Sequence, residues 1–238
     1  MSLIIKNMPE CGLGNKILYY YNFRQDAHTR NCNFFCVSWE GYQFFDGDLL
    51  GVYDPDEDYE TATLSLGDRF FKNSGLSTRE VFKLSSRPEL VPNTCAIHFR
   101  GTDFHSWNPN AILDYEYYKN SIDKIKTDVS LFKLFTDDKN LESFNKVKEK
   151  LNNENIYFLE GENTNNRLNY IKDFSFMTEC DWIISSPSTF CIAAGFIGKK
   201  KRIIHSEKWV RDSASKQDGF WTDLWNGGND DYSAWMLL

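Results

Sequence analysis

The chain has 238 residues and a formal net charge of −7, because 34 acidic residues outnumber 27 Lys and Arg. This length suits one large α/β domain or two small ones, and the acidic balance argues against a general nucleic-acid binder, which needs clustered cations. The opening segment, MSLIIKNMPE, is too short and too interrupted for a signal peptide, and no window is long and apolar enough for a transmembrane helix, so we expect a soluble, cytoplasmic protein.

The first part of the chain predicts few regular elements. A short strand at LIIKNM is followed by a loop and a helix at GLGNKILYYYNFRQDAHTR, and NFFCVSW is typical of a strand. Residues 46–68 are acidic, and we expect loops there. Pro88 and Pro92 interrupt regular structure, which indicates an N-terminal domain over 1–90 and a C-terminal domain over 91–238.

The second part of the chain alternates strands with helices. Strands are predicted at 95–99, 131–135, 155–160, 181–186 and 201–206. Helices are predicted at 111–126, 141–151, 167–180 and 189–198. This order favours a parallel sheet with crossover helices. The last 21 residues, which contain three of the seven Trp, are expected to pack back on the body because exposed indoles are costly.

Polar side chains gather where the predicted strands end. His98, Arg100 and Asp103 follow the first strand of this half, Asp137 follows the second, and a Ser/Thr cluster opens the helix after DWIIS. The cluster consists of Ser185, Ser186, Ser188 and Thr189. Parallel α/β sheets bind ligands at the carboxyl ends of their strands. Hydroxyls at a helix N-terminus suit a phosphate, although an ordinary helix cap has the same composition.

Three further patterns each allow two interpretations. GLGN at 12–15 is either a phosphate-cradling turn or an ordinary turn, and it lacks the dinucleotide fingerprint. The D-x-D spacings of DPDEDYE at 54–60 are either a metal site of the kind found in metal-dependent glycosyltransferases or an acidic surface loop. The six Cys include no CxxC pair and no zinc-ligand spacing, so we expect reduced thiols and no metal.

Four blocks resemble one family. HFRGTD at 98–103 resembles the H-x-R-x-x-D motif of the GT-B-type fucosyltransferases, which comprise the α-1,2 and α-1,6 enzymes and the protein O-fucosyltransferases. GLGNKILYY at 12–20 resembles their G-x-x-G-N-Q-[ML] loop, and FTDD at 135–138 resembles their strand ending in an acid. DFSFMTECDWIISSPSTFCIAAGF at 173–196 resembles their final motif. The blocks occur in the expected order and span most of the chain.

The resemblance implies an α/β, GT-B-like fold with two Rossmann-like domains, parallel sheets and a cleft between the domains. It implies inverting, metal-independent transfer of fucose from GDP-fucose, or of another nucleotide sugar, to a glycan acceptor, with no cofactor. Arg100 then holds the β-phosphate and stabilises the leaving diphosphate, as a fixed guanidinium can. The other donor-binding residues implied are Gly12, Gly14, Asn15, His98, Asp137, Ser186, Ser188, Thr189 and Phe190.

The proton acceptor for the transfer is predicted among two residues. Asp103 is the aspartate of the motif, and its carboxylate either accepts the proton or braces the arginine loop. Some relatives carry a glutamate shortly after the motif, whereas this chain continues FHSWNPN, which makes His105 the substitute. Two other functions remain open: a metal-dependent glycosyltransferase that uses Asp54–Asp58, and a catalytically silent nucleotide- or carbohydrate-binding module.

Overall fold

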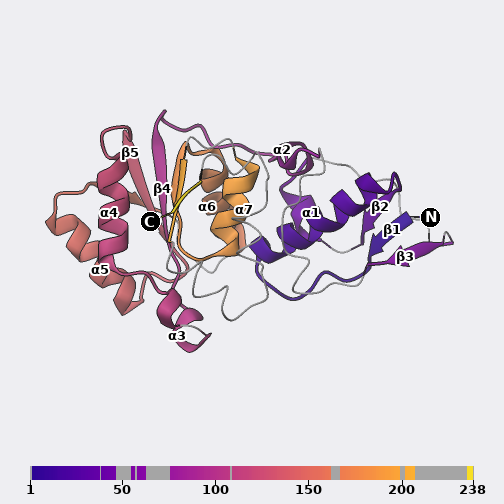
Figure 1. The fold of residues 1–238 in the computed structure, drawn as a ribbon, viewed down its shortest axis with the longest axis horizontal. Helices are drawn as coiled ribbons and strands as arrows, with labels where there is room; N and C mark the ends of the chain where they lie inside the picture. The colour runs from indigo at the N-terminus through magenta and orange to yellow at the C-terminus, as the bar shows by residue number, and fades with distance from the viewer. Residues whose placement is uncertain are drawn as a thin grey trace. The chain divides into compact units, whose positions relative to one another are not determined.

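A computed structural model describes most of the chain, namely residues 2–37, 39–46, 55–56, 58–62, 76–107, 109–161, 167–198, 202–206 and 235–237. These residues form two compact units, one up to Ser86 and one from Arg87 onwards. Each unit is an α/β structure with an all-parallel sheet (Figure 1), so the predicted α/β class is confirmed. No helix within these ranges has the length and apolar character needed to cross a membrane.

The first unit contains a three-stranded sheet in the order β2-β1-β3. Its strands are β1 (Ser2–Ile5), β2 (Phe34–Cys36) and β3 (Tyr59–Thr61). Helix α1 (Leu13–Thr29) connects β1 to β2 and presents buried aromatic and aliphatic side chains to the core. The prediction of loops throughout 46–68 is wrong at β3, which pairs with the buried strand β1 although its own side chains are largely exposed.

Aromatic side chains form the core beside this sheet. The ring of Tyr20 on α1 stacks on Trp39 with 3.9 Å between centroids, and Phe82 packs against both rings. The first unit also contains two short helices, η1 (Glu40–Gln43) and α2 (Thr78–Val81). The Ser77 hydroxyl accepts a hydrogen bond from the Glu80 amide and so caps α2, as serine commonly does.

The second unit contains a six-stranded parallel sheet in the order β6-β5-β4-β7-β8-β9. The strands are β4 (Thr94–Phe99), β5 (Leu131–Thr136), β6 (Phe158–Glu160), β7 (Trp182–Ile184), β8 (Arg202–His205) and β9 (Trp235–Leu237). The chain begins in the middle of the sheet, runs outward to β6 and then returns to β7 on the other side of β4. The connections therefore reverse direction between β4 and β7, which is the position where such sheets bind ligands.

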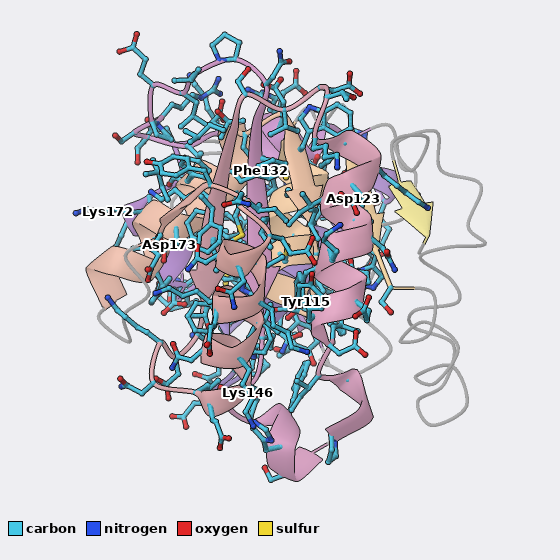
Figure 2. All side chains as sticks on the ribbon, turned by 90° about the vertical axis from the view of Figure 1, so that its left-hand side faces the viewer. Tyr115, Asp123, Phe132, Lys146, Lys172 and Asp173 are labelled. Atoms are coloured by element: carbon cyan, nitrogen blue, oxygen red, sulfur yellow. The ribbon has the colours of Figure 1, made fainter. Side chains whose placement is uncertain are left out.

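Helices cover both faces of this sheet (Figure 1). Helices α4 (Tyr115–Ile125) and α5 (Glu142–Asn153) pack on one face, where Phe99, Tyr118 and Phe144 are fully buried. Figure 2 looks onto this side, with Tyr115 and Asp123 along α4 and Lys146 on α5. Helices α6 (Arg167–Glu179) and α7 (Thr189–Ile197) cover the opposite face.

The structure corrects one helix start predicted in the second unit. Helix α4 begins at Tyr115 and not at Ala111, because the Asp114 carboxylate accepts a hydrogen bond from the Tyr117 amide at 3.2 Å and caps the helix there. Residues Pro109–Ala111 form a separate 3-10 turn, η3, which follows the short helix α3 (Phe104–Trp107). Near the end of the chain, β9 pairs with β8, whereas residues 218–234 of the predicted tail lie outside the described ranges.

Three asparagines adopt the left-handed conformation beside regular elements. Asn31 follows α1 with φ of 50°, Asn155 follows α5 with φ of 58°, and Asn93 precedes β4 with φ of 62°. After α5, the amide of Ile156 donates to the carbonyl of Leu151, which closes the helix end and turns the chain towards β6. Asparagine tolerates this conformation better than other residues with a side chain, so these positions are restricted in sequence.

Candidate functional site

The candidate site lies at the carboxyl edge of the second sheet, where the connections reverse. The segment after β4 leads to α3 and α4, and the segment after β7 leads to α7 on the opposite face. The two segments lead to helices on opposite faces of the sheet. The carboxyl ends of β4 and β7 therefore have no single connection running over both of them. The β4–β5 register pairs Phe99 with Thr136, which brings the residues after both strands side by side.

Asp137 holds the turn that carries Arg100. Its carboxylate accepts hydrogen bonds from the amides of Gly101 and Thr102, at 3.1 and 3.2 Å, and from the Thr102 hydroxyl. The same carboxylate lies 3.1 Å from Nε of Arg100. A Cβ atom at Gly101 would come within 2.8 Å of the Leu141 side chain, so a small residue is needed for this close approach. These contacts fix the guanidinium at the strand tip.

A second carboxylate, that of Asp103, also binds Arg100. Asp103 Oδ1 lies 3.0 Å from Nε, and Oδ2 lies 3.0 Å from Nη2, which is a side-on, two-contact arrangement. The side chain of Asp103 is 58% exposed, whereas that of Asp137 is 13% exposed. In the described part of the chain, no hydrogen bond or ion pair involves Nη1 of Arg100. The ring of Phe104 lies 5.8 Å from the guanidinium carbon.

His98 links β4 to the turn after β7. Its Nδ1 atom shares a hydrogen bond with the Ser186 hydroxyl at 2.6 Å, and its side chain is 4% exposed. Burial lowers the pKa of His98 to about 4, because the imidazolium form loses its hydration. His98 is therefore neutral near pH 7, and it can act as a hydrogen-bond partner but not as a fixed positive charge.

A second buried histidine, which the sequence analysis missed, holds the same turn from β8. His205 Nδ1 lies 2.9 Å from the Ser185 hydroxyl, and burial lowers its pKa to about 3. The Tyr117 hydroxyl of α4 donates to the Ser185 carbonyl at 2.7 Å. The sequence KRIIHS already indicated this contact. Its histidine ends a strand, and in a parallel sheet that strand can pair with DWIIS, which places the histidine next to the serines that end DWIIS.

The turn ends at the N-terminus of α7. Ser188 occupies the N-cap position and is 6% exposed, but its side chain makes no capping hydrogen bond in the described structure. The first turn of α7 contains no acidic residue, and Thr189 and Phe190 are half-buried there. A helix N-terminus offers amide donors and a partial positive charge. The Ser188 side chain thus lies at this N-terminus without capping it.

The other predicted residues are divided between the two units. His105 lies on α3 with an exposed side chain, in the second unit. Gly12, Gly14 and Asn15 belong to the first unit, where Gly12 is the N-cap of α1 and the other two lie in its first turn. A Cβ atom at Gly12 would meet no atom within 4 Å, so close packing does not explain this glycine.

The acidic stretch predicted as an alternative metal site is described only in part. Asp54 and Glu57 lie outside the described residues, whereas Asp56 and Asp58 lie within them. Among the described residues, no three His, Cys, Asp or Glu side chains are grouped as metal ligands. The metal-dependent alternative therefore stays a prediction.

The assembled groups are those expected of an anion site. They comprise a guanidinium held by two carboxylates, a helix N-terminus without an acidic residue, and two neutral histidines that hold the turn before that helix. In comparisons with known proteins, no family model matches the chain, and no curated protein matches it. Function is therefore inferred from the residues and the geometry of the site.

Proposed function

We propose that the protein is an inverting, metal-independent glycosyltransferase that transfers fucose from GDP-fucose to a glycan acceptor. The observation that carries this proposal is Arg100, which Asp137 holds at the carboxyl edge of a parallel sheet where the connections reverse. The two α/β units are then the two Rossmann-like domains of a GT-B-like enzyme.

The chemistry explains why a guanidinium stands at this position. As the bond between the sugar C1 and the phosphate oxygen breaks, its electron pair stays on the diphosphate and the negative charge there increases. A fixed arginine meets that charge without reorganising, and the amides at the N-terminus of α7 add donors nearby. The acceptor hydroxyl attacks C1 from the opposite face, and its proton passes to a base. The products are the fucosylated acceptor and GDP.

The structure favours different roles for the polar residues around Arg100. Asp137 already accepts hydrogen bonds from two amides and a hydroxyl, so we assign it to positioning Arg100 and not to guanine recognition. His98 and Ser186 position the turn that leads to α7. Ser188 and Thr189 bind phosphate in this proposal, and the half-buried ring of Phe190 packs against the base.

The direct test is turnover of a nucleotide sugar. GDP-fucose is incubated with the intact protein and a panel of glycan acceptors, in the presence of EDTA, and released GDP is quantified by chromatography. Removal of a single group that stabilises a developing anion commonly lowers kcat by about 100-fold or more, which is the effect we expect for Arg100→Ala. Arg87→Ala is the matched control, because Arg87 is an exposed arginine of the same unit whose ion pair with Glu179 is 3.8 Å long.

Three results would contradict the proposal. Turnover that EDTA abolishes indicates the metal-dependent alternative. GDP binding without any transfer or hydrolysis indicates a silent binding module. Equal activity of the Arg100→Ala and Arg87→Ala variants shows that the guanidinium at the strand tip does not contact the leaving group.

A further inference from the structure

We propose that Asp103 is an internal counter-ion that the diphosphate of the donor displaces from Arg100, and that the released carboxylate then accepts the proton of the acceptor hydroxyl. The inference rests on the proposed function, since it describes how the same site is regulated. It makes the base available only after the donor has bound.

The first argument is the contrast between the two carboxylates that bind Arg100. Asp137 is mostly buried and has three donors besides the guanidinium, so it cannot leave without unpairing several groups. Asp103 is 58% exposed, and in the described structure its carboxylate is bound by Arg100 alone. Exposed ion pairs of this kind are weak, so Asp103 is the partner that a ligand can replace.

The second argument is the geometry of the pair. Asp103 uses both oxygens against Nε and Nη2, each at 3.0 Å, which is the side-on arrangement that a phosphate also adopts on arginine. Asp103 shares Nε with Asp137, whose carboxylate lies 3.1 Å away, and it binds Nη2 as well, so its departure frees Nη2 beside Nη1 for two-contact binding of a diphosphate.

The third argument is charge. Arg100 with two ionised carboxylates carries a formal charge of −1, and His98 and His205 are neutral. If Asp103 stayed on Arg100, an approaching diphosphate would be repelled by this carboxylate beside the single cation. Movement of the Asp103 side chain towards solvent removes that repulsion and exposes the guanidinium.

The consequence for the reaction follows from where Asp103 goes. It lies three residues after Arg100, so its released side chain remains beside the bound donor. The acceptor oxygen forms a bond to C1, the bond from C1 to the phosphate oxygen breaks with its electron pair going to GDP, and the acceptor proton goes to the Asp103 carboxylate. Before the donor binds, the same carboxylate is bound to Arg100.

The test compares Asp103→Asn with the intact protein by calorimetric titration with GDP and, separately, with inorganic pyrophosphate. Asparagine keeps the size of the side chain and removes its charge. We expect both ligands to bind about twofold to fivefold more tightly to Asp103→Asn, because the ligand no longer competes with a surface ion pair. Asp123→Asn is the matched control, because it removes the same charge from an ion pair on α4 of the same unit (Figure 2) and leaves both affinities unchanged.

The outcomes separate this inference from the function on which it rests. GDP binding that is unchanged or weaker in Asp103→Asn overturns the displacement while leaving the proposed function standing. Tighter pyrophosphate binding in the variant, with no GDP binding to either protein, supports the displacement and contradicts the use of a GDP-sugar. Absence of binding of both ligands to both proteins overturns both proposals.

Transfer activity tests the second half of the inference. With saturating GDP-fucose, we expect Asp103→Asn to bind the donor more tightly and yet transfer fucose at least about 100-fold more slowly, as is typical when a general base is lost. A merely structural role would weaken binding and turnover together. Tighter binding with an unchanged kcat would show that Asp103 is displaced but is not the base.

Discussion

Acidification is expected to destabilise the second unit through its two buried histidines. His98 and His205 have pKa values of about 4 and about 3 in the folded protein, against 6.5 for an ordinary histidine, because burial disfavours the imidazolium. At a pH between the folded pKa and 6.5, each histidine is protonated in the unfolded chain and neutral in the folded one. The unfolded state therefore binds more protons, and the free energy of unfolding falls as the pH falls below about 6.5. Lowering the pH from 7.5 to 5 then costs about 2 kcal/mol for each histidine, or about 4 kcal/mol together.

The assay is equilibrium unfolding in urea, followed by Trp fluorescence at several values between pH 7.5 and pH 5. This window isolates the histidines, because carboxylates with lowered pKa values, such as those of Asp123 and Glu142, lose their contribution only at lower pH. The slope of the free energy of unfolding with urea is expected to stay constant. A loss of less than about 1 kcal/mol at pH 5 would refute the reasoning, since it would mean that the imidazoles can be protonated where they lie.

Substitutions at three positions test the packing and the local structure that position the site, each by the free energy of unfolding in urea. Phe144→Ala, at a fully buried position between α5 and the sheet, is expected to cost about 3 to 5 kcal/mol, and a loss below 1 kcal/mol would contradict the described core. Asn155→Ala is expected to cost about 1 to 2 kcal/mol, whereas Asn155→Gly should be nearly neutral; equal costs would mean that the left-handed conformation is not what matters. Asp137→Asn turns an acceptor into a group with its own donors and should cost about 1 to 3 kcal/mol, with weaker GDP binding; unchanged GDP affinity would contradict its assignment to positioning Arg100.

The sequence predicted the second sheet well because its strands and helices have hydrophobic patterns that can be recognised within short stretches of the chain. Buried runs such as CAIHF and DWIIS alternate with helices, and a parallel order is the usual way to bury both faces of such strands. The chain therefore carried enough information to place His98, Arg100 and Ser186 at one edge of the sheet. The contact of His98 with Ser186 follows from the pairing of β4 with β7, and the contact of Arg100 with Asp137 follows from the pairing of β4 with β5.

Elements without a hydrophobic pattern were not predictable in the same way. Strand β3 is short and largely exposed, and its pairing with β1 comes from backbone hydrogen bonds that no composition signals. The start of α4 depends on which residue caps it, and Asp114 determines that locally. The role of Asp137 could not be predicted from the sequence either. Asp137 follows β5, whereas the amide that it binds belongs to Gly101 in the turn after β4.

Calorimetric titration of GDP into the intact protein and into Arg100→Ala, both in EDTA, tests the central claim most directly. We predict that GDP binds the intact protein without a divalent cation and that the Arg100→Ala variant, which is folded by circular dichroism, loses this binding. Absence of GDP binding to the intact protein, or binding that is indifferent to Arg100, would contradict the assignment of a diphosphate site to this edge of the sheet.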